Sequence, residues 1–199
     1  MLIVPLSREL VGAVARLHCC TLKGLLSTLG VRAVRAYYLA CIESPSAVAL
    51  VCVEHNMVCG FVLGSADPTR LRAEVLRAAP VRILLAVCWR LVAKPSTGWH
   101  IFRHIRGPEK GGYDDRAAEL IYLAVSSDAR GRGVGQNLVD AFTQRMRDAG
   151  AGTYELSADD DNALAINFYE KREFQLITRF CRSGVWRRRY RLNTVQVRP

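Results

Sequence analysis

A glycine-rich run with two arginines is the passage of this sequence best suited to bind an anion. It reads Arg130-Gly131-Arg132-Gly133-Val134-Gly135 and lies between an apolar stretch and a segment with helical spacing. A turn that opens a helix presents unpaired backbone N–H groups and the positive end of the helix dipole. Glycine leaves that backbone open to the close approach of a phosphate. The run therefore predicts a phosphate-binding loop.

A second block narrows the kind of ligand. The loop lacks the Gly-Lys-Ser/Thr of a P-loop, and no acidic residue ends a second strand as a dinucleotide fold requires. The loop does match the pattern Arg-x-x-Gly-x-Gly, and it is followed by Asn162-x-x-Ala165-x-x-Phe168-Tyr169, which closes at Phe174. Together with the strand Ala118 to Val125, these blocks resemble the GNAT superfamily of acyl-CoA N-acyltransferases over residues 118–182.

The resemblance implies acetyl-CoA as co-substrate and direct transfer to an amine in a ternary complex. Backbone N–H groups from Arg130 to Gly135 would hold the pyrophosphate, and the strand around Leu123 and Val125 would pair with the pantetheine arm. The Leu123 N–H would polarise the thioester carbonyl, an oxyanion interaction worth roughly 3 kcal/mol. Tyr169 would protonate the departing thiolate. The full set implied to contact the coenzyme is Leu123, Val125, Arg130, Gly131, Arg132, Gly133, Val134, Gly135, Asn162 and Tyr169.

The attacking amine must also lose a proton, and Glu119 at the start of the strand is the candidate general base. Glu155, Tyr122 and a chain of water molecules are the alternatives. Two of the implied residues also have purely structural interpretations. Asn162 follows three aspartates and suits a helix N-cap, and Tyr169 shares a helix face with Ala165, as a core residue would.

The elements that must position these residues alternate between helix and strand, which predicts one α/β domain over residues 1–199. We expect a mixed central sheet of about six to seven strands, flanked by helices, with no internal repeat. The expected strands are 2–6, 47–53, 58–63, 119–125, 153–157, 174–181 and 185–192. The expected helices are 9–20, 31–42, 134–149 and 162–171.

Two features depart from the pattern of the superfamily. Glu173 stands where the family usually has glycine, and a non-glycine residue in a left-handed turn costs on the order of 1 kcal/mol, so we expect an altered turn. Residues 66–117 form a long insertion, helical and then loop-like, before the fourth strand. We expect it to roof the acceptor pocket, which Trp99, His100, His104 and Tyr113 could line.

The formal charge of +10 is distributed unevenly. Residues 1–65 carry +2, residues 66–110 carry +6, residues 111–178 carry −5, and the basic strand and tail 179–199 carry +7. The tail includes Trp186-Arg187-Arg188-Arg189-Tyr190-Arg191, and on a strand only alternate side chains of this run can share a surface. We therefore expect the tail to keep an edge strand soluble and to attract anions, rather than to bind specific nucleic acid. Val75 to Ala93 suits packing on the domain or peripheral membrane contact.

Seven cysteines without C-x-x-C spacing are expected to be buried thiols in a reducing compartment, and no set of ligands suits a metal. The N-terminal residues lack the pattern of a signal peptide. These features predict a cytoplasmic protein, monomeric or homodimeric.

Three functions fit the sequence. The first is an acetyltransferase that acts on the amine of a small anionic molecule, such as a nucleotide-linked amino sugar. The second is the same chemistry on a protein amine, at an N-terminus or a lysine. The third is a non-catalytic module that keeps the coenzyme A fold and binds RNA or an anionic membrane through its basic tail.

Overall fold

The computed structural model describes residues 1–78 and 116–194. Seven strands form one mixed sheet, as the sequence predicts. The strands are β1 (Leu2–Pro5), β2 (Val48–Glu54), β3 (Met57–Ser65), β4 (Glu119–Val125), β5 (Thr153–Asp159), β6 (Gln175–Arg182) and β7 (Val185–Asn193). The helices are α1 (Val11–Thr21), α2 (Leu25–Leu29), α3 (Val31–Glu43), α4 (Pro68–Ala78), α7 (Val134–Asp148) and α8 (Ala163–Glu170), with a 3-10 turn at Ser127–Ala129.

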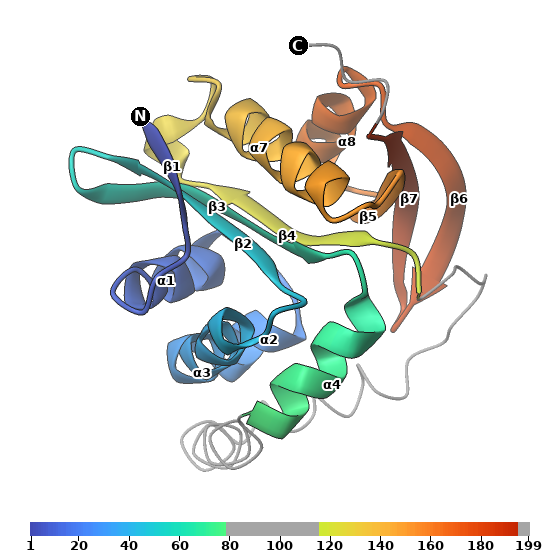
Figure 1. Cartoon of the computed structure of the whole chain (residues 1–199). Helices are drawn as coiled ribbons and strands as arrows, with labels where there is room; N and C mark the ends of the chain where they lie inside the picture. The colour runs from blue at the N-terminus through green and yellow to red at the C-terminus, as the bar shows by residue number, and fades with distance from the viewer. Residues whose placement is uncertain (79–115, 195–199) are drawn as a thin grey trace.

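The helices cover both faces of the sheet (Figure 1). α7 and α8 lie on one face, which we term the α7 face, and α1 to α4 lie on the other, the α1 face. Each face has its own hydrophobic core. Leu138, Phe142 and Tyr154 belong to the first, while Val14 and Tyr38 belong to the second. The two cores follow from the two-residue period of the strands, which sends alternate side chains to opposite faces.

The order of the strands is β1-β2-β3-β4-β5-β7-β6, and only β4 and β5 are parallel neighbours. Their pairing is short: Glu119 lies opposite Glu155, Leu120 lies opposite Leu156, and no further residues of the two strands are in register. Beyond Leu120 the strands therefore diverge. We term this divergence the β4–β5 fork.

Most of the expected elements are confirmed, within a few residues at their ends. Two short elements are unexpected, namely α2 and the 3-10 turn after β4. Of the expected insertion, α4 is described, and Trp99, His100, His104 and Tyr113 lie outside the described residues. The expectation of an altered turn at Glu173 is wrong. Glu173 adopts a left-handed φ of 62°, so the turn keeps its geometry despite the missing glycine.

The start of β4 is held very close to β3 and α7 at Gly64. A Cβ atom at this position would lie 2.3 Å from the Glu119 carbonyl oxygen and 2.4 Å from the Phe142 ring. The register between the two strands shifts at Leu63 and Gly64, which marks a bulge. A glycine is thus required for the backbone approach that places the first residues of β4.

We therefore predict that Gly64→Ala lowers the free energy of unfolding by about 1–3 kcal/mol or more, because the added methyl group overpacks the core. Thermal and urea unfolding would measure the loss. Gly12→Ala is the matched control, since a Cβ at Gly12 in α1 meets only the end of the Arg16 side chain, at 3.8 Å. Equal stability of the Gly64→Ala and wild-type proteins would contradict the packing argument.

Candidate active site

The glycine-rich loop joins β4 to α7 and has the conformation that anion binding requires. Gly131 and Gly133 adopt left-handed φ angles of 74° and 79°, and a Cβ atom at either would meet nothing within 4 Å. α7 starts directly after Gly133, so the N–H groups of its first turn have no intrahelical partners. The open backbone and the helix N-terminus together fit a pyrophosphate group.

The arginines of the loop are not equivalent. Arg130 is exposed, but its backbone N–H donates to the Ser127 carbonyl at 3.3 Å, so the expected set of backbone donors is better taken to begin at Gly131. Arg132 makes two hydrogen bonds, of 2.6 and 2.8 Å, to the carboxylate of Glu54 at the end of β2. The two residues are 78 positions apart in the sequence, so no local pattern predicts the pair. The pair attaches the loop to the β2–β3 hairpin.

The start of α7 also packs against the second sequence block. A Cβ atom at Gly135 would lie 3.5 Å from both the Phe168 ring on α8 and the Val125 side chain on β4. Leu123 and Val125 are partly buried against the core of the α7 face, three and five residues beyond the last paired residue of β4. The structure thus brings the loop, the open end of β4 and α8 to one end of the fork.

Tyr169 lies on α8 at the same core. Its side chain is 8% exposed and contacts the rings of Phe168, Phe174 and Tyr190 at centroid distances of 5.3, 5.3 and 6.2 Å. Burial raises the pKa of Tyr169 well above its ordinary value, so the hydroxyl stays protonated at neutral pH. In the described part of the chain, no residue forms a hydrogen bond with this hydroxyl, so its proton is available to a ligand.

Asn162 is the N-cap of α8, as its structural interpretation predicts. Its side-chain oxygen accepts a hydrogen bond of 3.2 Å from the N–H of Ala165. The cap orients the helix that carries Tyr169. A contact between Asn162 and the coenzyme stays a prediction.

The glutamates of the fork lie on the other face of the sheet. The side chain of Glu119 is 14% exposed and is bound by the guanidinium of Arg189 on β7. Glu155 is buried, and its two oxygens are taken by Arg189 at 2.8 Å and by Arg191 at 2.6 Å. Glu119 also lies between two arginines, Arg189 and, at 3.9 Å, Arg72, but its side chain is more exposed than that of Glu155, so it stays the candidate base. The sequence analysis did not predict a role for Arg189 in the site. The available signal was its position on β7 next to the buried Tyr190, which places the two side chains on opposite faces of the sheet.

Tyr122 is the other alternative base, and it lies on the α1 face. Burial raises its pKa to about 12, so the phenol is protonated at neutral pH and is a poor base. Beside it lies His18, whose ring centroid is 4.7 Å from that of Tyr122 and whose Nδ1 is hydrogen-bonded to the Tyr38 hydroxyl at 2.9 Å. Burial lowers the pKa of His18 to about 4, which leaves the imidazole neutral.

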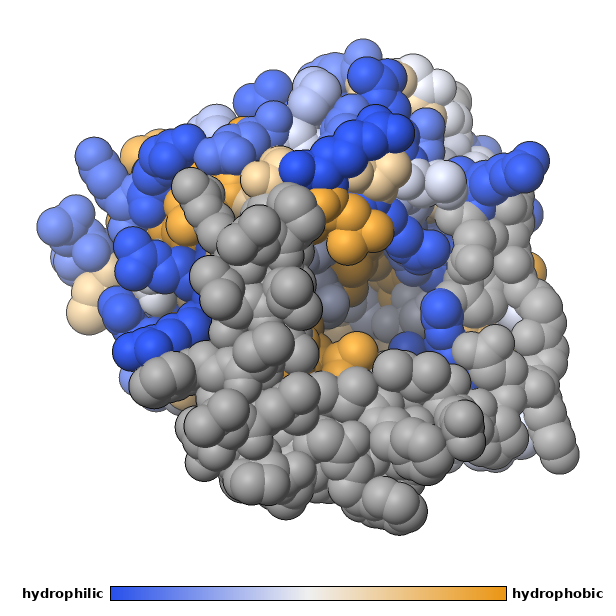
Figure 2. All heavy atoms as spheres, turned by 90° about the horizontal axis from the view of Figure 1, so that it is seen from below, coloured by the Kyte–Doolittle hydropathy of each residue, from blue (hydrophilic) through white to orange (hydrophobic). Residues whose placement is uncertain are grey.

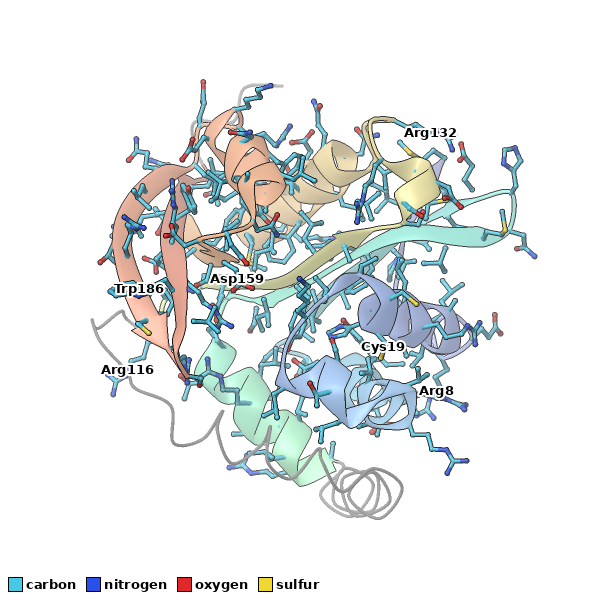
Figure 3. The ribbon with its side chains drawn as sticks, turned by 180° about the vertical axis from the view of Figure 1, so that it is seen from behind. Arg8, Cys19, Arg116, Arg132, Asp159 and Trp186 are labelled. Atoms are coloured by element: carbon cyan, nitrogen blue, oxygen red, sulfur yellow. The ribbon has the colours of Figure 1, made fainter. Side chains whose placement is uncertain are left out.

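The basic tail is largely paired with the acidic segment. Arg187 bonds Asp159 at 2.9 Å and Arg188 bonds Asp160 at 2.6 Å, which reflects the register of β7 on β5. Alternate arginines point to opposite faces, as expected. Figure 3 labels Trp186 on this hairpin and Arg132 near the opposite end of the sheet.

The surface on the side of α3 and α4 is hollowed, with hydrophobic side chains inside the hollow (Figure 2). A depression of about 330 Å³ lies between the end of α3 and α4 and contains none of the predicted site residues. Among residues 1–78 and 116–194, no cluster of ligands could hold a metal ion. In the same residues, every helix is too short or too polar to span a membrane.

Known proteins share both the sequence pattern and the fold. An acetyltransferase of Pectobacterium atrosepticum is 33% identical over 73 residues, which cover 37% of this chain and 52% of that protein. The chain thus matches about half the length of this curated relative. An aminoglycoside 6'-acetyltransferase superposes with a TM-score of 0.63 at 15% identity, over the full length of both chains. The NatC complex bound to Gag peptide and CoA gives 0.60 at 15% identity, over 96% of this chain and 97% of that one.

The match to a family covers more of the chain than the alignment with the Pectobacterium protein does. Residues 14–174 match the Acetyltransferase (GNAT) family, which is most of the chain and includes the loop, both glutamates of the fork and Tyr169. The chain belongs to the acetyltransferase (GNAT) family.

Proposed function

We propose that this protein transfers an acetyl group from acetyl-CoA to the primary amine of a small anionic molecule. The observation that carries the transfer chemistry is the convergence of the glycine-rich loop, the open end of β4 and the protonated Tyr169 at the β4–β5 fork. The loop offers backbone donors to a pyrophosphate. The unpaired edge of β4 offers its N–H and C=O groups to an amide-containing arm.

Three groups divide the work of the reaction. The amine nitrogen forms a bond to the thioester carbonyl carbon, and the Leu123 N–H stabilises the negative charge on the oxygen. When the carbon–sulfur bond breaks, the Tyr169 hydroxyl gives its proton to the sulfur. Glu119 takes the amine proton. Glu119 lies four positions before Leu123 on the strand, about 13 Å away, so this transfer runs through water.

The acceptor is assigned from the charges on the α1 face. Arg72 on α4 is 50% exposed and forms a long ion pair with Glu119, at 3.9 Å. Arg72 and Arg187 both lie near Tyr122, the residue before Leu123. Arg187 is paired with Asp159, so Arg72, whose ion pair with Glu119 is long, is the guanidinium suited to a carboxylate or phosphate on the acceptor. If peptide amines are the better substrates in the amine screen below, a protein acceptor replaces this assignment.

We expect Tyr169→Phe to lower kcat by about 100-fold, because the thiolate then leaves without a proton donor. The KM for acetyl-CoA should change little. Tyr190→Phe is the control, since its ring packs near Tyr169 while its hydroxyl bonds Glu170 at 2.9 Å. Thiol release with a saturating amine would give both constants. An unchanged kcat in Tyr169→Phe would remove Tyr169 from the mechanism.

Arg130→Ala should raise the KM for acetyl-CoA by about 5- to 10-fold, because a charge-assisted contact to phosphate is lost. The value of kcat should stay within about twofold, since the contact is made in ground and transition states alike. Arg145→Ala, an exposed arginine in the last turn of α7, controls for the loss of net charge. An equal rise of the KM for acetyl-CoA in the two variants would mean that Arg130 acts only through the net charge of the protein and makes no direct contact with the phosphate.

A screen of amines by thiol release tests the acceptor directly. We expect anionic small amines to be acetylated faster than peptides, and Arg72→Ala to raise their KM by about 10-fold while the KM for acetyl-CoA is unchanged. Arg70→Ala is matched on the same helix, where Arg70 pairs with Glu74 at 2.8 Å. Faster acetylation of peptides, with no effect of Arg72→Ala, would favour a protein acceptor.

A further inference from the structure

A buried arginine closes the β4–β5 fork. The side chain of Arg189 is 1% exposed, and its guanidinium bonds the carboxylates of Glu119 and Glu155 and, at 2.9 Å, the Ser157 hydroxyl. A buried charge is tolerated only when it is paired and hydrogen-bonded. Arg189 meets that condition with carboxylates from both arms of the fork.

The register explains why an arginine is needed there. Glu119 and Glu155 are direct neighbours across the parallel pair, at the first of its two paired positions. Like charges directly opposite each other destabilise a sheet. β7 carries Arg191 opposite Glu155, and Arg189 is two residues away on the same face, so its side chain can reach over both glutamates.

We infer that Arg189 is a positioning residue for acetyl transfer: it fixes the Glu119 carboxylate at the closed end of the fork, ready to receive the amine proton. This inference rests on the proposed role of Glu119. Arg189 bonds one oxygen of Glu119, and the other oxygen faces Arg72 at a distance of 3.9 Å, beyond a hydrogen bond. One carboxylate oxygen is thus held by Arg189, while the other, in a long ion pair with Arg72, can still accept a hydrogen bond from water.

The surroundings of Glu119 make the role measurable through pH. The charged and titratable groups that face it are Arg189 on β7, Glu155 on β5, Arg72 on α4 and Tyr122 on β4. Without Arg189 the opposed carboxylates have no cation between them, and such a pair shares a proton. The acidic limb of the rate profile then moves to higher pH.

The experiment compares Arg189→Lys, Arg189→Met and the double variant Arg189→Met/Glu155→Gln with the wild type. In Arg189→Met we expect kcat to fall at least about 10-fold and the acidic limb of kcat/KM to rise by about one pH unit, with the KM for acetyl-CoA within about twofold. Arg189→Lys keeps the charge but not the forked geometry, so kcat should be intermediate. The double variant removes the opposed charges and regains stability, yet kcat should stay low.

Arg191→Met is the matched control, because Arg191 is on the same strand and bonds Glu155 but not Glu119. Its kcat and pH profile should be those of the wild type. A wild-type kcat and pH profile in Arg189→Met or in the double variant would overturn the inference. If neither variant folds, a wild-type kcat in Arg189→Lys would overturn it.

Glu119→Gln separates the two proposals. If kcat falls in Glu119→Gln but not in the Arg189 variants, Arg189 has no positioning role, and Glu119 remains the proposed general base. If Glu119→Gln keeps the wild-type kcat and pH profile, the proposed role of Glu119 fails, and the inference fails with it.

Discussion

The site depends on the early separation of β4 and β5. Their backbones are paired at two positions only, so the rest of β4 has a strand neighbour on the β3 side alone. An unpaired strand edge in a protein interior is costly unless another group takes its hydrogen bonds. The loop to α7, the packing of α8 and the bridge made by Arg189 all lie around this opening. Arg189 holds the paired end of the two strands together, and the loop and α8 lie at the end where the strands have separated.

The alternation of side chains along the strands divides the chemistry between two faces. Tyr169 belongs to the core of the α7 face, whereas Glu119 meets Arg189 on the α1 face. The proposed proton donor and proton acceptor are therefore separated by the sheet itself. In the proposed mechanism, the bond changes take place in the opening between them.

Local pattern predicted most of the fold and much of the site. The strand before the loop, the helix after Gly133 and the cap at Asn162 each depend on residues close together in sequence. The bridge from Arg189 to Glu119 spans 70 residues and depends on strand order and register, which no local pattern contains. The same holds for Arg132 and Glu54. Glu173 shows the opposite error. The sequence rule expects an altered turn, but the exposed Glu173 adopts the left-handed conformation, and the N–H of Phe174 donates to the Tyr169 carbonyl at 3.1 Å across the turn.

The tail arginines pair with carboxylates at the end of β5 and directly after it, and this pairing shortens the range of their electrostatic field. Residues 179–199 carry +7, but in each pair with Asp159 or Asp160 the two fields largely cancel beyond a few ångströms. A paired charge acts on its surroundings as a dipole, and dissolved salt screens what is left over about 8–10 Å. The tail arginines that are paired in this way therefore exert little pull on a distant anion. These paired arginines interact electrostatically only with a molecule that is already in contact with the hairpin.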